Sequence, residues 1–298
     1  MRQLFLLQNP LDLAAAEVLA LTNKSHEQYD NFLIVNTAKN IAPRLSYTKQ
    51  VYKILFDCHK DDLLPKANRF KWKYKTFSIS HPSKHIRNEL VAILKKKSKL
   101  KLTKPEAKLK CFYINNKIWV TQLIHENKEK FEKRKPHKLT APHPASCDPK
   151  LARAMVNLTG INKGKILDPF CGAGGMLIEA SLMNLKPTGY DIDDKMLKRA
   201  KTNLKHLKCK ADLKLKDALT LPATNYIVSD LPYGKGTKAV NLKELYESFF
   251  KVLKKKLKKT AVIGIPDFVE INPKLKIKHE FIIYIHKSLS KRIIVFSS

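Results

Sequence analysis

The segment Ser229–Gly234, with the sequence SDLPYG, contains residue types that can act on a nucleobase. An apolar run before it predicts a buried strand, so Asp230 is expected where that strand ends. Its carboxylate and the backbone carbonyl of Leu231 can together accept both hydrogens of a planar amino group. Pro232 stiffens the loop, and Tyr233 offers a ring on which a base can stack. The segment indicates chemistry on a nucleobase amino group; an ordinary β-turn of Asp, Pro and Gly is the alternative.

A glycine-rich segment, Asp168–Gly175, has the sequence DPFCGAGG and is expected between a strand and a helix. Glycines at such a turn let the backbone approach a ligand where a side chain would collide with it. The spacing is neither the dinucleotide fingerprint GxGxxG nor a phosphate-binding P-loop. A plain glycine turn is the alternative. The candidate cofactor-binding residues here are Asp168, Pro169, Phe170, Cys171, Gly172, Gly174 and Gly175.

Two further carboxylates follow the next two expected strands. Asp191 precedes Ile192, and a carboxylate at this place can accept hydrogen bonds from both hydroxyls of a ribose, as in nucleotide-binding βαβ units. Asp217, followed by Ala218, would reach the amino group of an adenine in a nucleoside site. The alternatives are a helix N-cap by an aspartate just after Asp191, and a solvated loop acid at Asp217.

The elements that must position these residues alternate between strand and helix from about residue 148. This alternation predicts a mostly parallel sheet with ligands at the carboxyl ends of its strands. Two adjacent strands at the end of the chain, without a helix between them, predict an antiparallel hairpin. Strands are expected at 165–168, 188–191, 212–215, 226–230, 260–265, 278–286 and 291–296, and helices at 149–158, 176–183, 194–207 and 242–258.

The first part of the chain has a different pattern, which predicts a small α+β module. Asn115-Asn116 is expected as the turn of a hairpin. Residues 66–110 hold 15 basic and two acidic residues, and a basic rim is expected after the helix, at residues 95–101. Residues 126–142 are charged and then rich in proline, which is typical of a linker. Strands are expected at 3–8, 31–36, 52–58, 74–80, 108–114 and 117–124, and helices at 10–21 and 83–97.

Charge is the outstanding feature of the composition. The chain of 298 residues has 58 Lys and Arg against 26 Asp and Glu, a formal net charge of +32. The excess is spread over both halves, since residues 1–150 hold 30 basic and 13 acidic residues. A nucleic acid is the partner that such a charge favours, through contacts with phosphates. Solvated surface lysines of a lysine-rich or heat-adapted proteome are the alternative.

Several classes of protein are disfavoured by the sequence. The five cysteines form no CxxC pair, so we expect no metal site, and their scattered, odd number suits a reducing cytosol. The leucine-rich start is broken by polar residues and proline, which argues against a signal peptide or a membrane span. We therefore expect a cytoplasmic protein without membrane contact, and a monomer.

The two motifs together resemble class I methyltransferases that act on amino nitrogens. The segments RKPHK at 134–138, HPAS at 143–146 and DPKLARAMVNL at 148–158 make the chain similar to the archaeal tRNA (guanosine-10 N2)-methyltransferase family. The helix with LAAAE at 13–17 resembles that family's ferredoxin-like subdomain, and residues of about 50–125 resemble its THUMP domain, an RNA-binding module. One departure is Leu231, where many relatives carry a proline.

The resemblance implies a fold and a domain organisation. A class I Rossmann-like α/β methyltransferase domain, mostly parallel with an antiparallel C-terminal hairpin, is expected at residues 143–298. An α+β ferredoxin-like and THUMP RNA-binding domain is expected at 1–125, and a linker at 126–142. The implied partner is tRNA, and a small accessory subunit is left open.

The resemblance also implies a reaction: methylation of the N2 amino group of a guanosine in tRNA at position 10, once or twice, with S-adenosylmethionine as the cofactor. Asp230, Leu231, Pro232 and Tyr233 are then catalytic. The glycine-rich segment, Asp191, Ile192, Asp217 and Ala218 bind the cofactor. His143 lines the same pocket, with a packing histidine as the alternative.

Two other functions remain open at this stage. An amino methyltransferase of rRNA or DNA would use the same loop, because Asp-x-Pro-Tyr fits adenine N6 as well as guanine N2. A catalytically silent RNA-binding protein would need the charge but not the combination of the glycine turn, Asp191 and Asp230.

Overall fold

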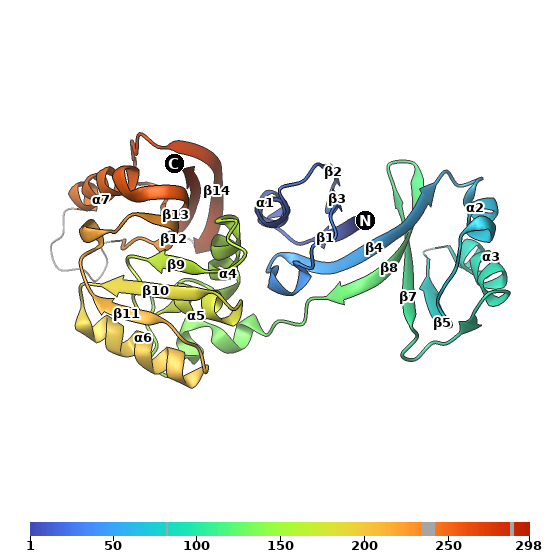
Figure 1. Ribbon diagram of the computed structural model, residues 1–298, viewed down its shortest axis with the longest axis horizontal. Helices are drawn as coiled ribbons and strands as arrows, with labels where there is room; N and C mark the ends of the chain where they lie inside the picture. Colours follow the sequence, from blue (N-terminus) through green and yellow to red (C-terminus); the bar gives the residue numbers. More distant parts are fainter. Residues whose placement is uncertain (82, 234–241, 287–288) are drawn as a thin grey trace. The chain divides into compact units, whose positions relative to one another are not determined.

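The computed structural model describes residues 1–81, 83–233, 242–286 and 289–298 (Figure 1). The chain divides into two compact units. Unit 1 comprises residues 1–11, 22–43 and 48–128, and unit 2 comprises residues 12–21, 44–47 and 129–298. Gly234, the last residue of the SDLPYG motif, lies outside the described residues.

Unit 2 is built on a seven-stranded sheet in the order β11-β10-β9-β12-β13-β15-β14. The strands from β11 to β13 are parallel, and β15 runs antiparallel to both β13 and β14. This confirms the expected mostly parallel sheet with a closing antiparallel hairpin. The bounds are β9 (Lys165–Asp168), β10 (Lys186–Asp191), β11 (Asp212–Leu215), β12 (Thr224–Asp230), β13 (Leu257–Pro266), β14 (Lys276–His286) and β15 (Leu289–Ser297).

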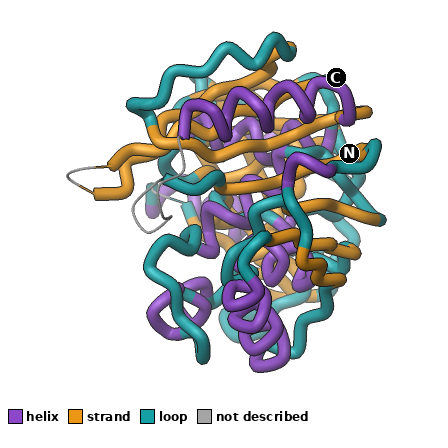
Figure 2. Tube along the Cα trace, turned by 90° about the vertical axis from the view of Figure 1, so that its left-hand side faces the viewer, coloured by secondary structure: helices purple, strands orange, loops and turns teal. Residues whose placement is uncertain are grey.

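Helices pack against the strands of this sheet (Figures 1 and 2). Two of them begin at aspartate caps: the carboxylate of Asp148 accepts from the backbone of Lys150 and Leu151, and that of Asp193 accepts from Lys195. The leucines of α5 and α6 share one core cluster, whereas the aromatic face of α7 packs into another with β12 and β13. The helices are α4 (Pro149–Leu158), α5 (Gly175–Leu182), α6 (Asp194–His206) and α7 (Leu242–Lys256).

The first helix, α1 (Leu11–Thr22), contributes its residues 12–21 to unit 2. Its Glu17 is fully buried and accepts from the Ser46 backbone at 2.9 Å, the Tyr47 backbone at 3.0 Å and the Asn157 amide at 2.8 Å. A buried carboxylate needs such partners, because leaving it unpaired is costly. The Leu-Ala-Ala-Ala-Glu helix is therefore fastened to α4 by Glu17.

Residues 129–142 also belong to unit 2, although their composition is that of a linker. They form two short 3-10 turns, at Phe131–Arg134 and Pro136–Lys138. The buried Glu179 of α5 accepts from Arg134 at 2.7 Å and from Arg153 of α4 at 2.8 Å. Two guanidinium groups thus pin this stretch to the helices.

We expect Glu179→Gln to lower the free energy of unfolding by about 3–5 kcal/mol, because it removes the fully buried carboxylate from two poorly hydrated arginines and leaves them only the partly exposed Glu129. Urea unfolding measures this. Lys198→Gln is the matched control, since its pair with Asp194 is exposed and contributes about 0–1 kcal/mol. Equal effects of the two substitutions would contradict this account.

Unit 1 contains an eight-stranded mixed sheet in the order β2-β3-β1-β4-β8-β7-β5-β6. Asn115 and Asn116 have φ of 47° and 57°, as the expected hairpin turn requires. The α+β class is as expected, while β2, β6 and α2 were not predicted because they are short. The elements are β1 (Arg2–Leu7), β2 (His26–Tyr29), β3 (Phe32–Asn36), β4 (Thr48–Cys58), α2 (Leu63–Arg69), β5 (Thr76–Ser80), α3 (Lys84–Lys95), β6 (Lys99–Leu100), β7 (Ala107–Ile114) and β8 (Lys117–Glu126).

Candidate active site

The candidate site lies where the order of the parallel strands reverses. The chain runs outward from β9 to β11 and then returns to β12, which is the other neighbour of β9. Loops leaving such a pair at their carboxyl ends turn apart and leave a crevice, the usual ligand site of these sheets. The hydroxyl of Ser229 donates to Asp168 at 2.6 Å and joins the two strand ends. The sheet therefore brings the glycine segment and Asp230 to one edge.

The glycine turn is open on one side and packed on the other. Gly172 has a φ of 49°, and nothing lies within 4 Å of the place that a Cβ would take. Gly174 has a φ of 90°, and a Cβ there would lie 3.2 Å from the Cβ of Ala200 on α6. Gly175 starts α5. The turn thus offers bare backbone at Gly172 for a ligand to approach.

Asp191 lies against this turn at the end of β10. Its Oδ2 accepts from the Gly172 backbone N–H and its Oδ1 from that of Asp193, both at 2.9 Å. Burial raises the pKa of Asp191, and these two hydrogen bonds oppose the shift. Each oxygen keeps a lone pair for a further donor. Ile192 beside it is 77% exposed, an apolar surface next to the carboxylate. This combination fits the ribose and the flat base of a nucleoside.

Asp168 is buried beneath the site. Besides Ser229, it accepts from the backbone N–H of Phe170 at 3.2 Å. Burial raises the pKa of Asp168 to about 7, against the opposing effect of these hydrogen bonds. The side chain holds two loops together, and its place is below the ligand surface.

The raised pKa has a consequence for stability. An unfolded aspartate has a pKa of about 3.9, so the unfolded chain releases a proton that the native protein retains up to about pH 7. The contribution is therefore fully present below about pH 4 and is lost as pH rises to about 7, by at most about 1.4 kcal/mol per pH unit. We expect Asp168→Asn to flatten the fall in the free energy of unfolding between about pH 5 and about pH 7.5, as measured by urea titrations. The exposed Asp217→Asn is the control, and an unchanged slope in Asp168→Asn would contradict the assignment.

The remaining candidates for cofactor binding are Asp217, Ala218 and His143. Asp217 caps a 3-10 turn (Ala218–Thr220) by accepting from Leu219 at 2.8 Å, and Ala218 is buried. His143 is partly exposed and receives a backbone hydrogen bond from Ser146 at its carbonyl.

Three residues of the DPFCGAGG segment support the turn from below. Pro169 is buried, and Phe170 packs edge-on against Phe249 of α7, with ring centroids 5.1 Å apart. Cys171 is buried under Gly189, where an added Cβ would lie 2.9 Å from its Sγ. These contacts fix the turn against both faces of the sheet.

Asp230 ends β12 and is paired with a lysine. Its Oδ2 accepts from Nζ of Lys291 at 2.6 Å, and the same ammonium lies 4.7 Å from the ring centroid of Tyr233. Burial raises the pKa of Asp230, while Lys291 and the hydroxyl of Tyr233 lower it. The pKa of Lys291 is raised because Asp230 outweighs the effect of burial. A buried ion pair therefore lies at the carboxyl end of β12.

The second oxygen of Asp230 is poised for a donor. Oδ1 is buried and, among the described residues, receives no hydrogen bond of good geometry. It lies over Gly264 of β13, where an added Cβ would come within 2.8 Å of it. A buried acceptor without a partner is costly unless a ligand supplies the donor.

The loop after Asp230 is held by its neighbours. The Leu231 side chain is buried, and its backbone N–H donates to Gly264 at 2.9 Å. The carbonyl of Pro232 accepts from Tyr246 of α7 at 2.7 Å. A proline at position 231 would lack the N–H of the first bond. Leucine at position 231 thus keeps one more backbone hydrogen bond between the β12 segment and β13.

The sequence did not point to three residues that shape the site: Tyr246, Gly264 and Lys291. Lys291 follows Asp230 by 61 positions and stands beside Arg292 near the start of β15, so the sequence alone does not distinguish the buried cation from its neighbour. Among the described residues, no cluster of His, Cys, Asp and Glu could hold a metal ion. No helix in the described part of the chain is long and apolar enough to cross a membrane.

Comparisons with known proteins agree with this geometry. Residues 136–268 match a family model described as RMKL-like, methyltransferase domain. The tRNA (guanine(10)-N2)-dimethyltransferase of Methanothermobacter thermautotrophicus is 32% identical over 287 residues, 86% of this chain and 84% of the relative. The enzyme of that name from Methanocaldococcus jannaschii is 30% identical over an alignment of 325 positions, gaps included, which covers 92% of each chain. TrmN from Thermus thermophilus, at 17% identity, superposes over the full length of both chains with a TM-score of 0.51, so the fold is shared.

Proposed function

This chain belongs to the tRNA (guanine(10)-N2)-dimethyltransferase family, and we propose that it methylates the N2 amino group of guanosine 10 in tRNA. The methyl donor is S-adenosylmethionine, and N2-methylguanosine and N2,N2-dimethylguanosine are the products. The observation that carries the proposal is the buried Oδ1 of Asp230, which receives no hydrogen bond of good geometry from the described residues and lies at the same edge of the sheet as the glycine turn.

The residues present fit the cofactor. Asp191 would hold the ribose hydroxyls, Ile192 would cover one face of the adenine, and the bare backbone at Gly172 leaves room for the rest. When bound, S-adenosylmethionine supplies an electrophilic methyl group. The caps at Asp217 and the packing at Asp168 keep this surface in place.

Asp230 makes the base reactive by orientation and by charge. The lone pair of a guanine N2 is delocalised into the ring, so the amino group is a poor nucleophile. A hydrogen bond from N2 to Oδ1 aligns it, and the carboxylate stabilises the positive charge that grows on nitrogen in a site screened from water. The proton then leaves to Asp230 or to water.

Tyr233 must turn aside when a base enters. Its buried hydroxyl lies beside the carboxylate of Asp230, so the amino group of a base reaches Oδ1 only after this side chain moves. The freed ring can then stack on the guanine. A paired guanosine cannot reach such a crevice, so local unpairing or flipping of the nucleotide precedes the reaction.

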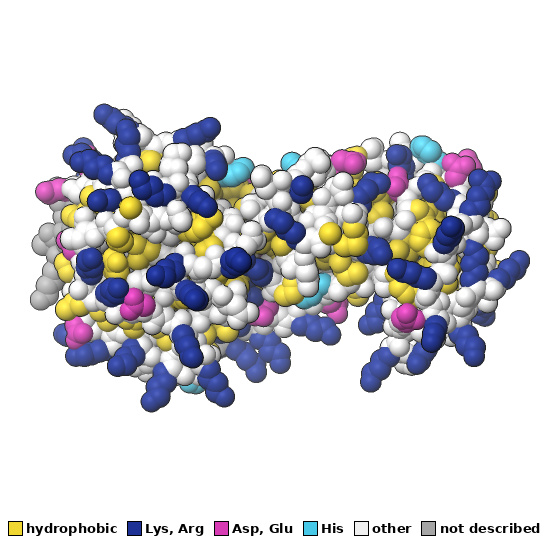
Figure 3. Space-filling model, in the orientation of Figure 1, with side chains coloured by type: hydrophobic (Ala, Val, Ile, Leu, Met, Phe, Trp, Pro, Cys, Tyr) yellow, Lys and Arg dark blue, Asp and Glu magenta, His cyan; other side chains and the backbone are white. Residues whose placement is uncertain are grey.

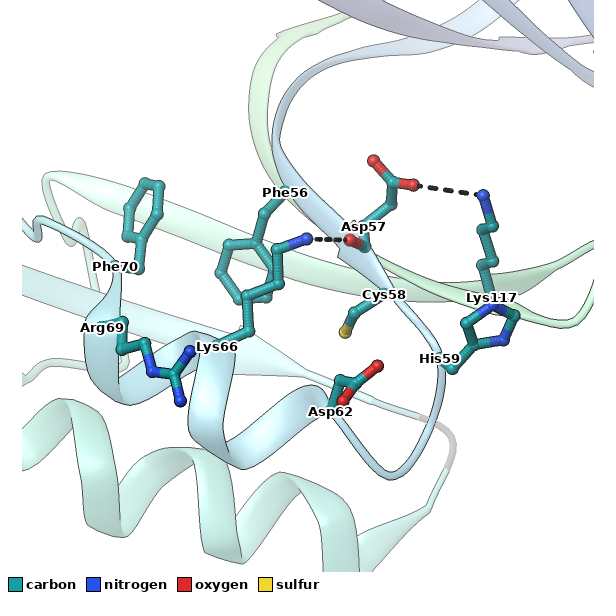
Figure 4. A pocket seen from close by; sticks show the side chains of 9 residues that line it. All are labelled: Phe56, Asp57, Cys58, His59, Asp62, Lys66, Arg69, Phe70 and Lys117. Carbon is teal, nitrogen blue, oxygen red and sulfur yellow. Dashed lines mark hydrogen bonds and ion pairs between the residues drawn. The ribbon is translucent and has the colours of Figure 1, made fainter.

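Unit 1 supplies the docking surface for RNA in this proposal, in the role of the THUMP domain. Lys and Arg side chains are scattered over the visible face of both units (Figure 3). Unit 1 has a hollow of about 690 Å³ that combines cations with aromatic rings (Figure 4). Lys66 and Lys117 contact Asp57 there, and Arg69 and Phe70 also line the hollow. Phosphates bind to the cations of such a hollow, and bases stack on its aromatic rings.

We expect Arg69→Glu to weaken tRNA binding about tenfold at about 0.1 M salt, because it replaces a phosphate contact with a repulsive charge. Electrophoretic mobility shift or filter binding measures this. Lys24→Glu changes the net charge equally at an exposed place outside the hollow and serves as the control. Equal losses would show that only total charge matters.

The proposal is tested by offering tRNA, rRNA and DNA side by side with tritiated cofactor, together with calorimetric titration of S-adenosylhomocysteine. Label in tRNA alone supports it. Label in rRNA or DNA favours the other amino methyltransferases, and the absence of S-adenosylhomocysteine binding favours a silent RNA-binding protein.

A further inference from the structure

The burial of the Lys291 side chain requires an explanation. Its side chain projects from β15, opposite Pro266, at the same carboxyl edge of the sheet as Asp230. The whole residue is 4% exposed. An ammonium group strongly favours water, so a lysine persists in such a place only when it is paired. Its recorded partners are the Asp230 carboxylate at 2.6 Å and the ring of Tyr233.

We propose that Lys291 is a positioning residue for methyl transfer: it occupies Oδ2 of Asp230, keeps the carboxylate ionised, and leaves Oδ1 as the oxygen that accepts the amino hydrogen of the base. This inference rests on the proposed function, because it assigns the second oxygen to the substrate. The lysine itself touches neither the base nor the methyl donor.

The geometry divides the two oxygens of the carboxylate between two tasks. Oδ2 of Asp230 on β12 accepts a hydrogen bond from Nζ of Lys291 on β15. Oδ1 lies over Gly264 and receives no hydrogen bond of good geometry from the described residues. A charged hydrogen bond of this length keeps Oδ2 occupied by the ammonium group. The oxygen left for the amino group is therefore selected by Lys291 before the base arrives.

The charges around Asp230 show why the lysine is needed. The groups that face the pair are Tyr233 after β12, Tyr246 on α7, Cys147 and Asp148 before α4, and Asp168 on β9. Lys291 is the one cation among these described groups. Burial raises the pKa of Asp230, and the ammonium opposes that shift. Without it, a carboxyl in this place would hold its proton to a higher pH and could no longer accept a hydrogen bond at that oxygen.

The test compares Lys291→Met, Lys291→Gln and Lys291→Arg with the wild type. The pKa of the Asp230 carboxyl is followed by NMR in cofactor-free protein labelled with ¹³C at aspartate, with Asp230→Asn to assign the signal. We expect this pKa to rise by at least about one unit in the Met and Gln variants and to stay near the wild-type value in the Arg variant. Lys278→Met, at an exposed place on β14, is the matched control.

The pH profile of kcat/KM for tRNA gives the second readout. We expect the acid limb of Lys291→Met to move up by at least about one pH unit, with an activity at pH 7 at least about tenfold below wild type that recovers as pH rises. Lys291→Arg restores most of the loss, and S-adenosylhomocysteine binds all variants within about twofold.

Three results would overturn the inference: an unchanged pKa of Asp230 in both Met and Gln variants, a loss of rate that is equal at every pH, or a loss that follows thermal stability in all three variants. The NMR titration needs no turnover. A wild-type protein without methyl transfer therefore refutes the proposed function, while the pKa comparison still decides the role of Lys291.

Discussion

Asp230→Ala is expected to lower kcat for methyl transfer by at least about 10³-fold, because it removes the acceptor that orients the amino group and stabilises its growing charge. Single-turnover transfer of labelled methyl groups to tRNA measures this. The binding of S-adenosylhomocysteine and of tRNA should remain within about threefold of wild type, since neither depends on this oxygen.

The controls separate chemistry from folding. Asp267→Ala removes an exposed carboxylate just after β13, at the same edge of the sheet, and should leave kcat unchanged. Asp230→Asn keeps an oxygen acceptor without the charge and should lie between the two. An Asp230→Ala variant that binds cofactor and methylates tRNA at a wild-type rate would refute the assignment of Asp230.

Asp191→Ala is expected to weaken S-adenosylhomocysteine binding by at least about 100-fold. Two hydrogen bonds from ribose hydroxyls to a charged acceptor contribute about 1.5–3 kcal/mol each, and the glycine turn also loses its bond to Gly172. Isothermal titration calorimetry at pH 7.5 measures the affinity directly.

Asp194→Asn is the matched control for this prediction, because Asp194 begins α6 nearby and is exposed. Its affinity for S-adenosylhomocysteine should equal that of wild type. Tight binding by Asp191→Ala would place the cofactor elsewhere, and the glycine turn would then be structural only.

Local motifs made much of the site predictable. Asp168–Gly175 and Asp230–Tyr233 each follow an apolar run, so the end of a strand and the loop after it can be read from neighbouring residues. The reversal of strand order then brings both to one edge, as the alternation of strands and helices predicts. Their roles in binding and catalysis stay predictions until the variants are measured.

Features that depend on distant partners were not predictable. Lys291 on β15 meets Asp230 at the end of β12 across the intervening strand β13, and no spacing rule relates the two. Residues 129–142 look like a linker, yet Arg134 is held by the buried Glu179. Glu17 looks like an ordinary helix surface residue, yet it is buried with Ser46 and Asn157. In each case a partner distant in the sequence, and not the neighbouring residues, determines where the charged side chain lies.

The most direct measurement of the central claim is nucleoside mass spectrometry of tRNA after incubation with the pure protein and S-adenosylmethionine. The account predicts N2-methylguanosine and N2,N2-dimethylguanosine at position 10, and no methylation there when inosine, which lacks the amino group, replaces that guanosine. Methyl groups on adenine, on another guanine atom, or on the inosine-containing site would contradict it.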